Sequence, residues 1–253
     1  LALLIACRAF DAMNLDRSGI IGVTMPGMHT STKTHKNAVD MMKSLQITVK
    51  EIDINNHVKE HFKLIGHDGV TQDITYENTQ ARARTMILMN LANKHNGLVL
   101  GTGDLSELVL GWCTYNGDQM SMYGINAGIP KTLVSFMIQN YADHKFSTDV
   151  KDTLYSILDT PITPELASNQ KTEDTIGKYE VNDFIIHRVL RYGDNKERII
   201  WLLPKVFDIT NEDAGNYASN FFKRFYSQQF KRQALPDGPK ILDISVSPRG
   251  DLR

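Results

Sequence analysis

Apolar side chains in the first hundred residues recur with two different periods. Spacings of three to four residues predict helices over 1–15, 34–45 and 76–94, with another around Val58, Phe62 and Ile65. Shorter apolar or β-branched runs predict strands over 20–24, 47–54 and 97–100. Because helices and strands alternate, this half of the chain predicts an α/β fold with a doubly wound parallel sheet.

The second half of the chain is predicted to be mainly helical. The apolar spacing predicts helices over 131–141, 148–158, 181–191, 196–203 and 214–230. The polar, proline-containing stretch 161–175 is typical of a surface loop rather than of a domain boundary. Because we find no internal repeat and no low-complexity linker, we expect one domain over residues 1–253 with a helical C-terminal part.

Composition narrows the class of protein. The chain has 253 residues, of which 42% are apolar and 23% charged, and this balance fits a globular protein of the cytoplasm. A net charge of −1 gives no overall attraction to nucleic acid, so we expect no such partner. The two cysteines are too few for a disulfide framework. No apolar run approaches the ~20 residues of a membrane helix, so no membrane partner is expected either.

The beginning of the chain is an apolar helix pattern that lacks an initiator methionine. In a doubly wound sheet the first helix commonly follows a central strand. The loop between that strand and the helix is a common phosphate site, because it faces the positive end of the helix. We therefore expect that the sequence starts inside a longer polypeptide, with the first strand and the phosphate loop upstream.

A Gly-Thr-Gly turn at 101–103 is the clearest candidate for a ligand site. It follows the predicted strand 97–100, and open α/β sheets bind ligands at the carboxyl ends of their strands. Thr102 offers a hydroxyl there and Glu107 a carboxylate. Each also has a plain structural alternative: Thr102 suits a turn that bonds its own backbone. Asp104 and Glu107 have the spacing of a helix capping box.

Five longer motifs, in order along the chain, resemble those of one family. They are Tyr-Glu-Asn-Thr-Gln-Ala-Arg-Ala-Arg at 76–84, Leu-Gly-Thr-Gly-Asp-Leu-Ser-Glu-Leu at 100–108, Gly-Trp-Cys-Thr-Tyr at 111–115, Asn-Ala-Gly-Ile-Pro-Lys-Thr-Leu at 126–133 and Phe-Lys-Arg-Gln-Ala-Leu-Pro-Asp-Gly-Pro-Lys at 230–240. Together they resemble the synthetase domain of NAD⁺ synthetases of the glutamine-dependent type. These enzymes are ATP pyrophosphatases with an adenine nucleotide alpha hydrolase-like fold. The family's phosphate loop and glutaminase domain are expected upstream.

The resemblance implies an ATP-dependent amidation of deamido-NAD⁺ to NAD⁺. In that reaction the nicotinate carboxylate displaces pyrophosphate from ATP, and ammonia then attacks the acyl adenylate and releases AMP. The ammonia is supplied directly or from glutamine, and Mg²⁺ is the implied cofactor. The resemblance also implies a homodimer formed through this domain, and a higher oligomer with the glutaminase domain.

The resemblance assigns ATP contacts to Met25, Thr102, Lys131 and Thr163. Lys131 follows Pro130 at a predicted helix start and matches a lysine that holds the phosphates. A cation in a first turn opposes the helix dipole, so a purely structural role is poorly motivated. Thr163 matches a second phosphate contact, and the backbone of Met25 is expected near adenine. Glu107 matches a position associated with Mg²⁺ and the dinucleotide. The catalytic candidates are Lys131 and Glu107.

The resemblance assigns deamido-NAD⁺ contacts to Asn78, Arg82, Glu107, Trp112, Cys113, Thr114, Tyr115 and Lys231. Asn78 and Arg82 are four residues apart and share a helix face, whereas Arg84 is expected at the surface. Aromatic faces at 112–115 suit a cationic pyridine ring, although core packing is the alternative. Lys231 matches a residue that closes over the substrate. Its alternative is a solvated basic tail.

A metal site and a non-catalytic role are the two other hypotheses that the sequence raises. His57 and His61 are one helical turn apart, but no third ligand follows at a convincing spacing, so we expect surface histidines. For the whole chain, the alternative to the ligase is a non-catalytic protein. It would bind a dinucleotide or a partner on a shortened synthetase fold.

Overall fold

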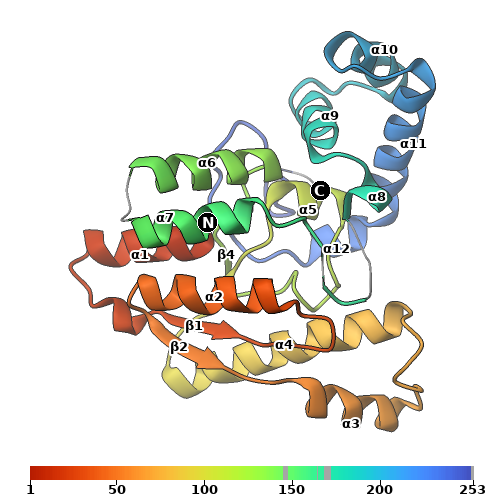
Figure 1. Cartoon of the computed structure of the whole chain (residues 1–253). Helices are drawn as coiled ribbons and strands as arrows, with labels where there is room; N and C mark the ends of the chain where they lie inside the picture. Colours follow the sequence, from red (N-terminus) through yellow and green to blue (C-terminus); the bar gives the residue numbers. More distant parts are fainter. Residues whose placement is uncertain (145–147, 164, 168–171, 252–253) are drawn as a thin grey trace. The chain divides into compact units, whose positions relative to one another are not determined.

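The computed structural model describes residues 1–144, 148–163, 165–167 and 172–251 (Figure 1). The chain divides into two compact units, and each is built from separate stretches of sequence. Unit 1 comprises Leu1–Val99, Asn116–Asp118 and Ser135–Lys171. Unit 2 comprises Leu100–Tyr115, Gln119–Val134 and Thr172–Arg253. No helix in the described ranges is long and apolar enough to cross a membrane.

Unit 1 contains a parallel strand pair joined through a helix. After α1 (Ala2–Ala12) and the short 3₁₀ helix η1 (Arg17–Gly19), strand β1 (Ile21–Thr24) pairs in parallel with β2 (Thr48–Glu51). Helix α2 (Thr32–Ser44) connects the two strands. Both strands were predicted, but β2 is shorter than 47–54. The Ile52 amide still bonds the Thr24 carbonyl at 2.9 Å, and the chain then turns into the next helix.

Unit 1 also contains α3 (Asn55–Ile65), α4 (Ile74–His95), α7 (Thr148–Leu158) and the part of α6 (Lys131–His144) from Ser135 onward. The core between α3 and α4 is formed by Ile54, Val58, Phe62, Tyr76 and Ala83. Ile65, expected with the buried face of α3, is instead 48% exposed at the last turn. Helix α4 begins where the Asp73 side chain accepts the Tyr76 amide at 2.9 Å.

Unit 2 contains a second parallel strand pair and is otherwise mainly helical. Strand β3 (Leu100–Gly101) pairs with β4 (Tyr123–Gly124), and α5 (Leu105–Leu110) follows β3. The later helices are α8 (Thr172–Ile176), α9 (Tyr179–Tyr192), α10 (Lys196–Val206), α11 (Asn211–Ser227) and α12 (Gln229–Gln233). Figure 1 shows α9, α10 and α11 grouped together, and they share one hydrophobic core with α5.

The predicted strand 97–100 is wrong in its position. Leu98 is 61% exposed, and the paired strand begins only at Leu100. The reason is the end of α4: Asn96 adopts a left-handed conformation with φ 50°, and the Gly97 amide bonds the Ala92 carbonyl at 2.9 Å. The cap of α4 therefore includes Gly97, which the apolar run had assigned to a buried strand.

Candidate functional site

Lys131 forms the centre of a charged cluster in unit 2. It is the first residue of α6 (Lys131–His144), as predicted. Its Nζ lies 2.5 Å from Asp104 Oδ2 and 2.6 Å from Glu107 Oε1. The Asp104 side chain is only 2% exposed and that of Lys131 17%. The cluster therefore holds one cation between two carboxylates in a largely buried setting.

The two carboxylates are placed by the start of α5. Asp104 Oδ1 accepts the Glu107 amide at 3.0 Å, and Glu107 Oε2 accepts the Asp104 amide at 3.2 Å. This is a complete capping box, which satisfies two amides that a helix start leaves unpaired. The capping role is thus confirmed. The second oxygen of each carboxylate is turned toward Lys131, so the cap also orients the charged cluster.

The start of α6 is fixed by residues that the sequence analysis did not select. The Lys131 amide donates to Ser106 Oγ at 2.9 Å. Asp183 of α9 accepts from the Ser106 hydroxyl, and from the amide and hydroxyl of Thr132 at 3.0 and 2.7 Å. Only the fold brings Asp183 here, because 77 residues separate it from Ser106. No local spacing could have predicted this support.

Burial and the neighbouring charges shift the pKa values of the cluster. Burial, followed by the charge of Glu107, raises the pKa of Asp104 above its ordinary value. For Lys131, burial acts to lower the pKa, but the charges and hydrogen bonds of Glu107 and Asp104 outweigh it and raise the pKa. The Lys131 Nζ also lies 5.5 Å from the ring centre of Tyr179. The hydroxyl of Tyr179, a buried residue, has no hydrogen-bond partner among the residues that the structure describes.

Lys231 is joined to the predicted dinucleotide segment. From α12 its Nζ donates to the carbonyls of Gly111 at 2.8 Å and Cys113 at 2.6 Å. It is therefore not a solvated residue of a basic tail. The neighbouring Phe230 packs on Tyr115 with ring centres 5.4 Å apart, and Tyr115 remains 39% exposed. The partly exposed ring of Tyr115 thus lies in the same group as the hydrogen-bonded ammonium of Lys231.

The other residues of this segment are partly enclosed. Trp112 and Cys113 are half-buried, and Thr114 is buried. The guanidinium of Arg224 lies 5.1 Å from the Trp112 ring centre and also donates to the Leu110 carbonyl at 3.0 Å. Trp112 therefore takes part in packing, as the structural alternative proposed. The more exposed Tyr115 is the ring that a ligand can reach.

The two threonines predicted to contact ATP lie outside the helices and strands. Thr102 is exposed, and its carbonyl accepts the Asn126 side-chain amide at 3.3 Å. Thr163 is half-buried, and its hydroxyl accepts the Glu165 amide at 3.2 Å. The Thr163 hydroxyl is therefore bonded within its own loop, whereas the turn alternative for the Thr102 hydroxyl stays a prediction.

The structure corrects the prediction for Arg84 in unit 1. Arg84 is half-buried, and its Nε donates to the Met25 carbonyl at 3.1 Å, whereas Arg82 is exposed and Asn78 is half-buried. Arg84 follows the buried Gln80 by one helical turn, so α4 directs it inward. The flanking alanines suggested the opposite assignment. Met25 is thereby held through its backbone carbonyl.

The predicted site residues are divided between the two units. Those in unit 1 are Met25, Asn78, Arg82 and Thr163. Those in unit 2 are Thr102, Glu107, Trp112, Cys113, Thr114, Tyr115, Lys131 and Lys231. Within unit 2 the structure brings together two groups, one around Lys131 and one around Lys231. The described residues contain no group of three or more histidine, cysteine, aspartate or glutamate side chains suited to a metal, and His57 and His61 are exposed.

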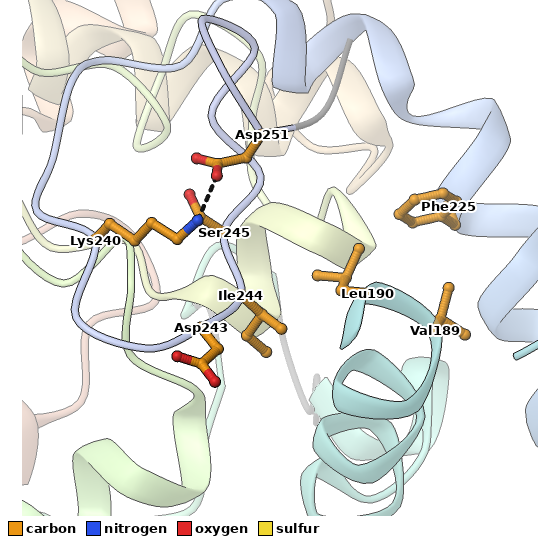
Figure 2. Close-up of a pocket in the computed structure, with 8 residues that line it drawn as sticks. All are labelled: Val189, Leu190, Phe225, Lys240, Asp243, Ile244, Ser245 and Asp251. Carbon is orange, nitrogen blue, oxygen red and sulfur yellow. Dashed lines mark hydrogen bonds and ion pairs between the residues drawn. The ribbon is translucent and has the colours of Figure 1, made fainter. Parts of the chain in front are cut away.

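A pocket of about 270 Å³ in unit 2 lies apart from these groups. Figure 2 shows its apolar side chains on α9 and α11, and the ion pair at 2.5 Å between Lys240 and Asp251 in the C-terminal segment. Its lining consists of Val189, Leu190, Phe225, Lys240, Asp243, Ile244, Ser245 and Asp251. None of these was predicted as a site residue, so the pocket is not the candidate site.

Comparison with known proteins identifies relatives across nearly the whole chain. A family model described as NAD synthase matches residues 3–233. The glutamine-dependent NAD(+) synthetase of Mycobacterium leprae is 42% identical, in an alignment that covers 100% of this chain and 42% of that protein. The enzyme of the same name from Acinetobacter baylyi is 31% identical over 94% of this chain and 42% of its own length. The chain thus spans less than half the length of these relatives.

Solved structures show the same fold. A glutamine-dependent NAD(+) synthetase from Cytophaga hutchinsonii superposes with a TM-score of 0.76 at 18% identity, over 91% of this chain and 37% of that one. The NMN synthetase from Francisella tularensis gives 0.64 at 19% identity, over 91% and 81%. A glutamine-dependent NAD+ synthetase from Acinetobacter baumannii, in complex with ADP, gives 0.54 at 24% identity, over 98% and 42%. The predicted α/β fold is confirmed by these likenesses.

Proposed function

Because the chain belongs to the NAD synthase family, we propose that its protein converts deamido-NAD⁺ to NAD⁺ at the expense of ATP. The observation that carries this proposal is the buried cluster of Lys131, Asp104 and Glu107 within a chain of that family. The non-catalytic alternative is not favoured, because the relatives matched over the whole chain are named as synthetases.

The proposed reaction has two chemical steps. The nicotinate carboxylate attacks the α-phosphorus of ATP, the bond to the bridging oxygen breaks, and pyrophosphate leaves. Ammonia then attacks the acyl carbon, the bond to the AMP oxygen breaks, and the nitrogen loses a proton. The first step builds negative charge on the phosphoryl oxygens, and a fixed cation stabilises such charge.

Lys131 is proposed to supply that cation. The raised pKa keeps its ammonium protonated, and the capping box and Asp183 fix the start of its helix. Asp104 and Glu107 pair with the ammonium in the absence of ATP. When ATP binds, its phosphates would replace these carboxylates as the counter-ion of Lys131. Met25, Thr102 and Thr163 complete the proposed ATP contacts.

Glu107 is the proposed ligand of Mg²⁺. Carboxylate oxygens are the donors that this ion prefers, and Glu107 is 24% exposed, unlike the enclosed Asp104. When bound, Mg²⁺ supplies positive charge to the phosphates. One oxygen of Glu107 remains engaged by the helix cap, which would keep the other oxygen oriented. Glu107 therefore offers one oriented carboxylate oxygen to the ion.

Several residues are proposed to contact the dinucleotide. Tyr115 offers an exposed ring for the nicotinate half, beside the Lys231 ammonium and the segment that includes Trp112, Cys113 and Thr114. Asn78 and Arg82 supply an amide and a guanidinium, and arginine suits phosphate recognition.

The assembly of the protein is also a proposal. We propose that residues 1–253 act as one synthetase domain, that this domain forms a homodimer in the cytoplasm, and that a glutaminase domain delivers ammonia. The glutamine-dependent names of the relatives support the last point. Light scattering of the full-length protein tests the homodimer and any higher oligomer.

The first experiment measures NAD⁺ and AMP formation by the full-length protein from deamido-NAD⁺, ATP and Mg²⁺, with ammonium and then with glutamine. Turnover with both nitrogen sources is expected. Turnover with ammonium alone would remove the glutaminase from the proposal. No turnover from folded protein would overturn the ligase. Lys240→Met is the matched control for Lys131→Met, because Lys240 also pairs with an aspartate but lies outside the proposed site.

A further inference from the structure

One face of α4 carries a polar stripe formed by Tyr76, Gln80 and Arg84. These residues are spaced by four, so they follow one another along a single face of the helix. Tyr76 and Gln80 are buried, with 4% and 0% exposure. Each member of the stripe contacts a loop of unit 1. One loop, 25–30, follows β1, and the other, described at 161–163 and 165–167, follows α7.

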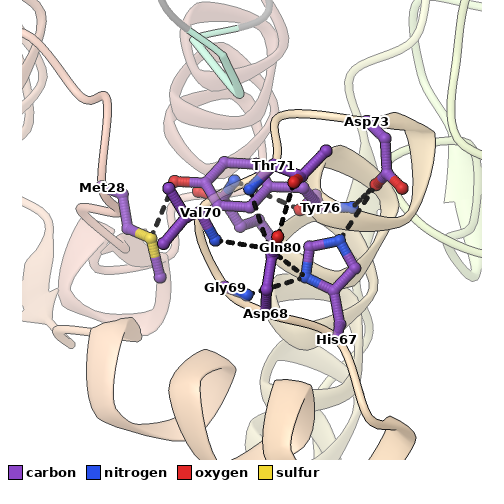
Figure 3. Close-up of polar contacts among 9 residues, drawn as sticks. All are labelled: Met28, His67, Asp68, Gly69, Val70, Thr71, Asp73, Tyr76 and Gln80. Carbon is purple, nitrogen blue, oxygen red and sulfur yellow. Dashed lines mark hydrogen bonds and ion pairs between the residues drawn. The ribbon is translucent and has the colours of Figure 1, made fainter.

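Tyr76 holds the far end of the first loop. Its hydroxyl donates to Met28 Sδ at 2.9 Å, and it lies 3.0 Å from Nε2 of His29. Figure 3 shows Met28 beside the Tyr76 hydroxyl, with the Gln80 side chain on the same helix. The Tyr76 ring also stacks on Phe62 at 5.4 Å, so the hydroxyl is carried by a ring that the core fixes.

Arg84 holds the near end of the same loop. Its Nε donates to the Met25 carbonyl, and this is the only hydrogen bond of the Arg84 side chain to the described part of the chain. Burial lowers the pKa of the Arg84 guanidinium, and the charges of Glu165 and Asp118 oppose that shift. Enclosing a guanidinium is costly unless it is paired. An apolar side chain would fill this position at lower cost, so helix packing does not explain an arginine here.

Gln80 links the second loop to the same stripe. Its Nε2 donates to the Leu166 carbonyl at 3.0 Å and to the Tyr76 carbonyl at 3.3 Å. Its Oε1 is buried and has no hydrogen-bond partner within the described ranges. The loops with Met25 and Thr163 are therefore tied to adjacent turns of one helix.

Gly27 shows how closely the first loop lies on the stripe. A Cβ at this position would lie 2.8 Å from an Arg84 terminal nitrogen and 3.1 Å from Gln80 Oε1. The first distance is too short for a real contact, so a side chain at residue 27 would push the end of the Arg84 side chain aside. The loop therefore packs against α4 and is also hydrogen-bonded to it through Met25 and Met28.

We propose that the Tyr76–Gln80–Arg84 stripe is the device that positions the two ATP-contacting loops, with Arg84 as the positioning residue for the Met25 carbonyl. This inference rests on the proposed function, because it takes Met25 and Thr163 as ATP contacts. The same helix carries Asn78 and Arg82 away from the stripe. Loosening the stripe therefore acts on the nucleotide side and spares the proposed dinucleotide contacts of α4.

The test begins with steady-state kinetics of Arg84→Met in the full-length protein. Methionine keeps most of the side-chain volume and removes every donor. We expect the KM for ATP to rise about tenfold, the usual effect of losing a hydrogen bond from a charged group. kcat and the KM for deamido-NAD⁺ stay within a factor of about three, since α4 keeps its other contacts. Arg84→Lys restores part of the loss, because an ammonium can still donate to the Met25 carbonyl.

Amide hydrogen exchange without ligands gives a readout that needs no turnover. Arg84→Met is expected to speed exchange at Gly27 and Thr30, whose amides bond within the loop at 3.0 and 3.3 Å. Gly27→Ala, whose methyl group would displace the end of the Arg84 side chain, is expected to give the same pattern. Lys94→Met is the control, because Lys94 is exposed near the end of the same helix. It leaves both readouts unchanged.

The outcomes separate the two proposals. Unchanged exchange at Gly27 and Thr30 in both Arg84→Met and Gly27→Ala overturns the positioning role. An equal change in kcat and in both KM values also overturns it, because that pattern indicates general damage. If wild-type protein is folded but does not turn over deamido-NAD⁺ and ATP, the proposed function fails. The ATP role of the stripe then falls with it, even if exchange shows that the stripe holds the loop.

Discussion

The two compact units hold their predicted site residues in different ways. In unit 2, Lys131 stands at a helix start between two carboxylates, and Asp183 from another helix fixes that start. In unit 1, Met25 lies in a loop that a helix face holds through its backbone carbonyl. A buried charge needs rigid partners on several elements, because each unpaired charge would be costly. A loop that presents backbone groups to a ligand needs only to be held against a neighbouring element.

One hydrophobic cluster from each unit can be compared in the same way. Helices α5, α8, α9, α10 and α11 of unit 2 contribute to an extensive cluster that includes Leu105, Val109, Ile185, Leu203 and Phe221. The cluster between α3 and α4 of unit 1 contains five buried residues. The cluster of unit 2 includes the helix that presents Asp104 and Glu107, whereas the α3–α4 cluster supports one long helix. The predictions below test this contrast.

The largest effect is expected for Lys131→Met. It leaves Asp104 and Glu107 facing each other without a cation, so the free energy of unfolding falls by about 3–5 kcal/mol. Turnover falls at least about a hundredfold if the lysine stabilises the transferring phosphoryl group. Urea unfolding of the variant, compared with Lys240→Met, measures the first effect. A loss below about 1 kcal/mol would show that the cluster behaves like an exposed ion pair.

Truncations of buried side chains compare these two clusters directly. Leu203 of the unit 2 cluster and Ile54 of the α3–α4 cluster are both 0% exposed. Each change to alanine should lower the free energy of unfolding by about 2–5 kcal/mol, because it removes buried methyl groups and leaves a cavity. We expect the larger loss at Leu203, since its cluster contains more buried residues. Equal losses from denaturant titrations would remove the proposed difference between the clusters.

The Thr210 cap of α11 should contribute less. Its hydroxyl accepts the Asp213 amide at 3.0 Å, and Asp213 completes a capping box. Thr210→Ala is expected to cost about 1 kcal/mol, the usual effect of losing such a cap. Thr210→Ser retains the hydroxyl and serves as the control. If serine costs as much as alanine in thermal unfolding, the cap is not the reason for the loss.

The smallest effect concerns a turn of unit 1 and its dependence on pH. Asp68 accepts the amides of Val70 and Thr71, both at 2.8 Å, and the Thr71 hydroxyl at 2.5 Å (Figure 3). The hydroxyl bond, then the amide bonds, lower the pKa of Asp68 from 3.8 to about 2. A lowered pKa means that the stabilisation is complete above about pH 4 and is lost as pH falls toward 2.

Asp68→Asn tests that direction. The variant should unfold at lower urea than wild type at pH 7, and the gap should narrow between pH 4 and pH 3, because protonation weakens the wild-type acceptor. Asp152→Asn is the control for the loss of an exposed carboxylate. A gap that stays constant over this range would mean that Asp68 stabilises the turn without its charge.

Interactions within a few residues were readable from the sequence. The spacing of Asp104 and Glu107 predicted the capping box, and Pro130 predicted the helix start at Lys131. The alternation of apolar periods predicted parallel pairing for β1 and β2. The capping box and the helix start depend on contacts between near neighbours, whose geometry the helix repeat already defines. The strand pairing follows from the order of helices and strands along the chain.

Contacts between distant segments were decided only by the tertiary structure. No local pattern places Asp183 under Ser106, or chooses Arg84 over Arg82 for the inward face of α4. The exposed Leu98 shows the same limit, because a helix cap at Asn96 took residues that an apolar run assigned to a strand. The family motifs and the local caps were determined by the sequence itself. Which side chains support them depends on packing between segments far apart in the chain, and residue spacing carries no information about that packing.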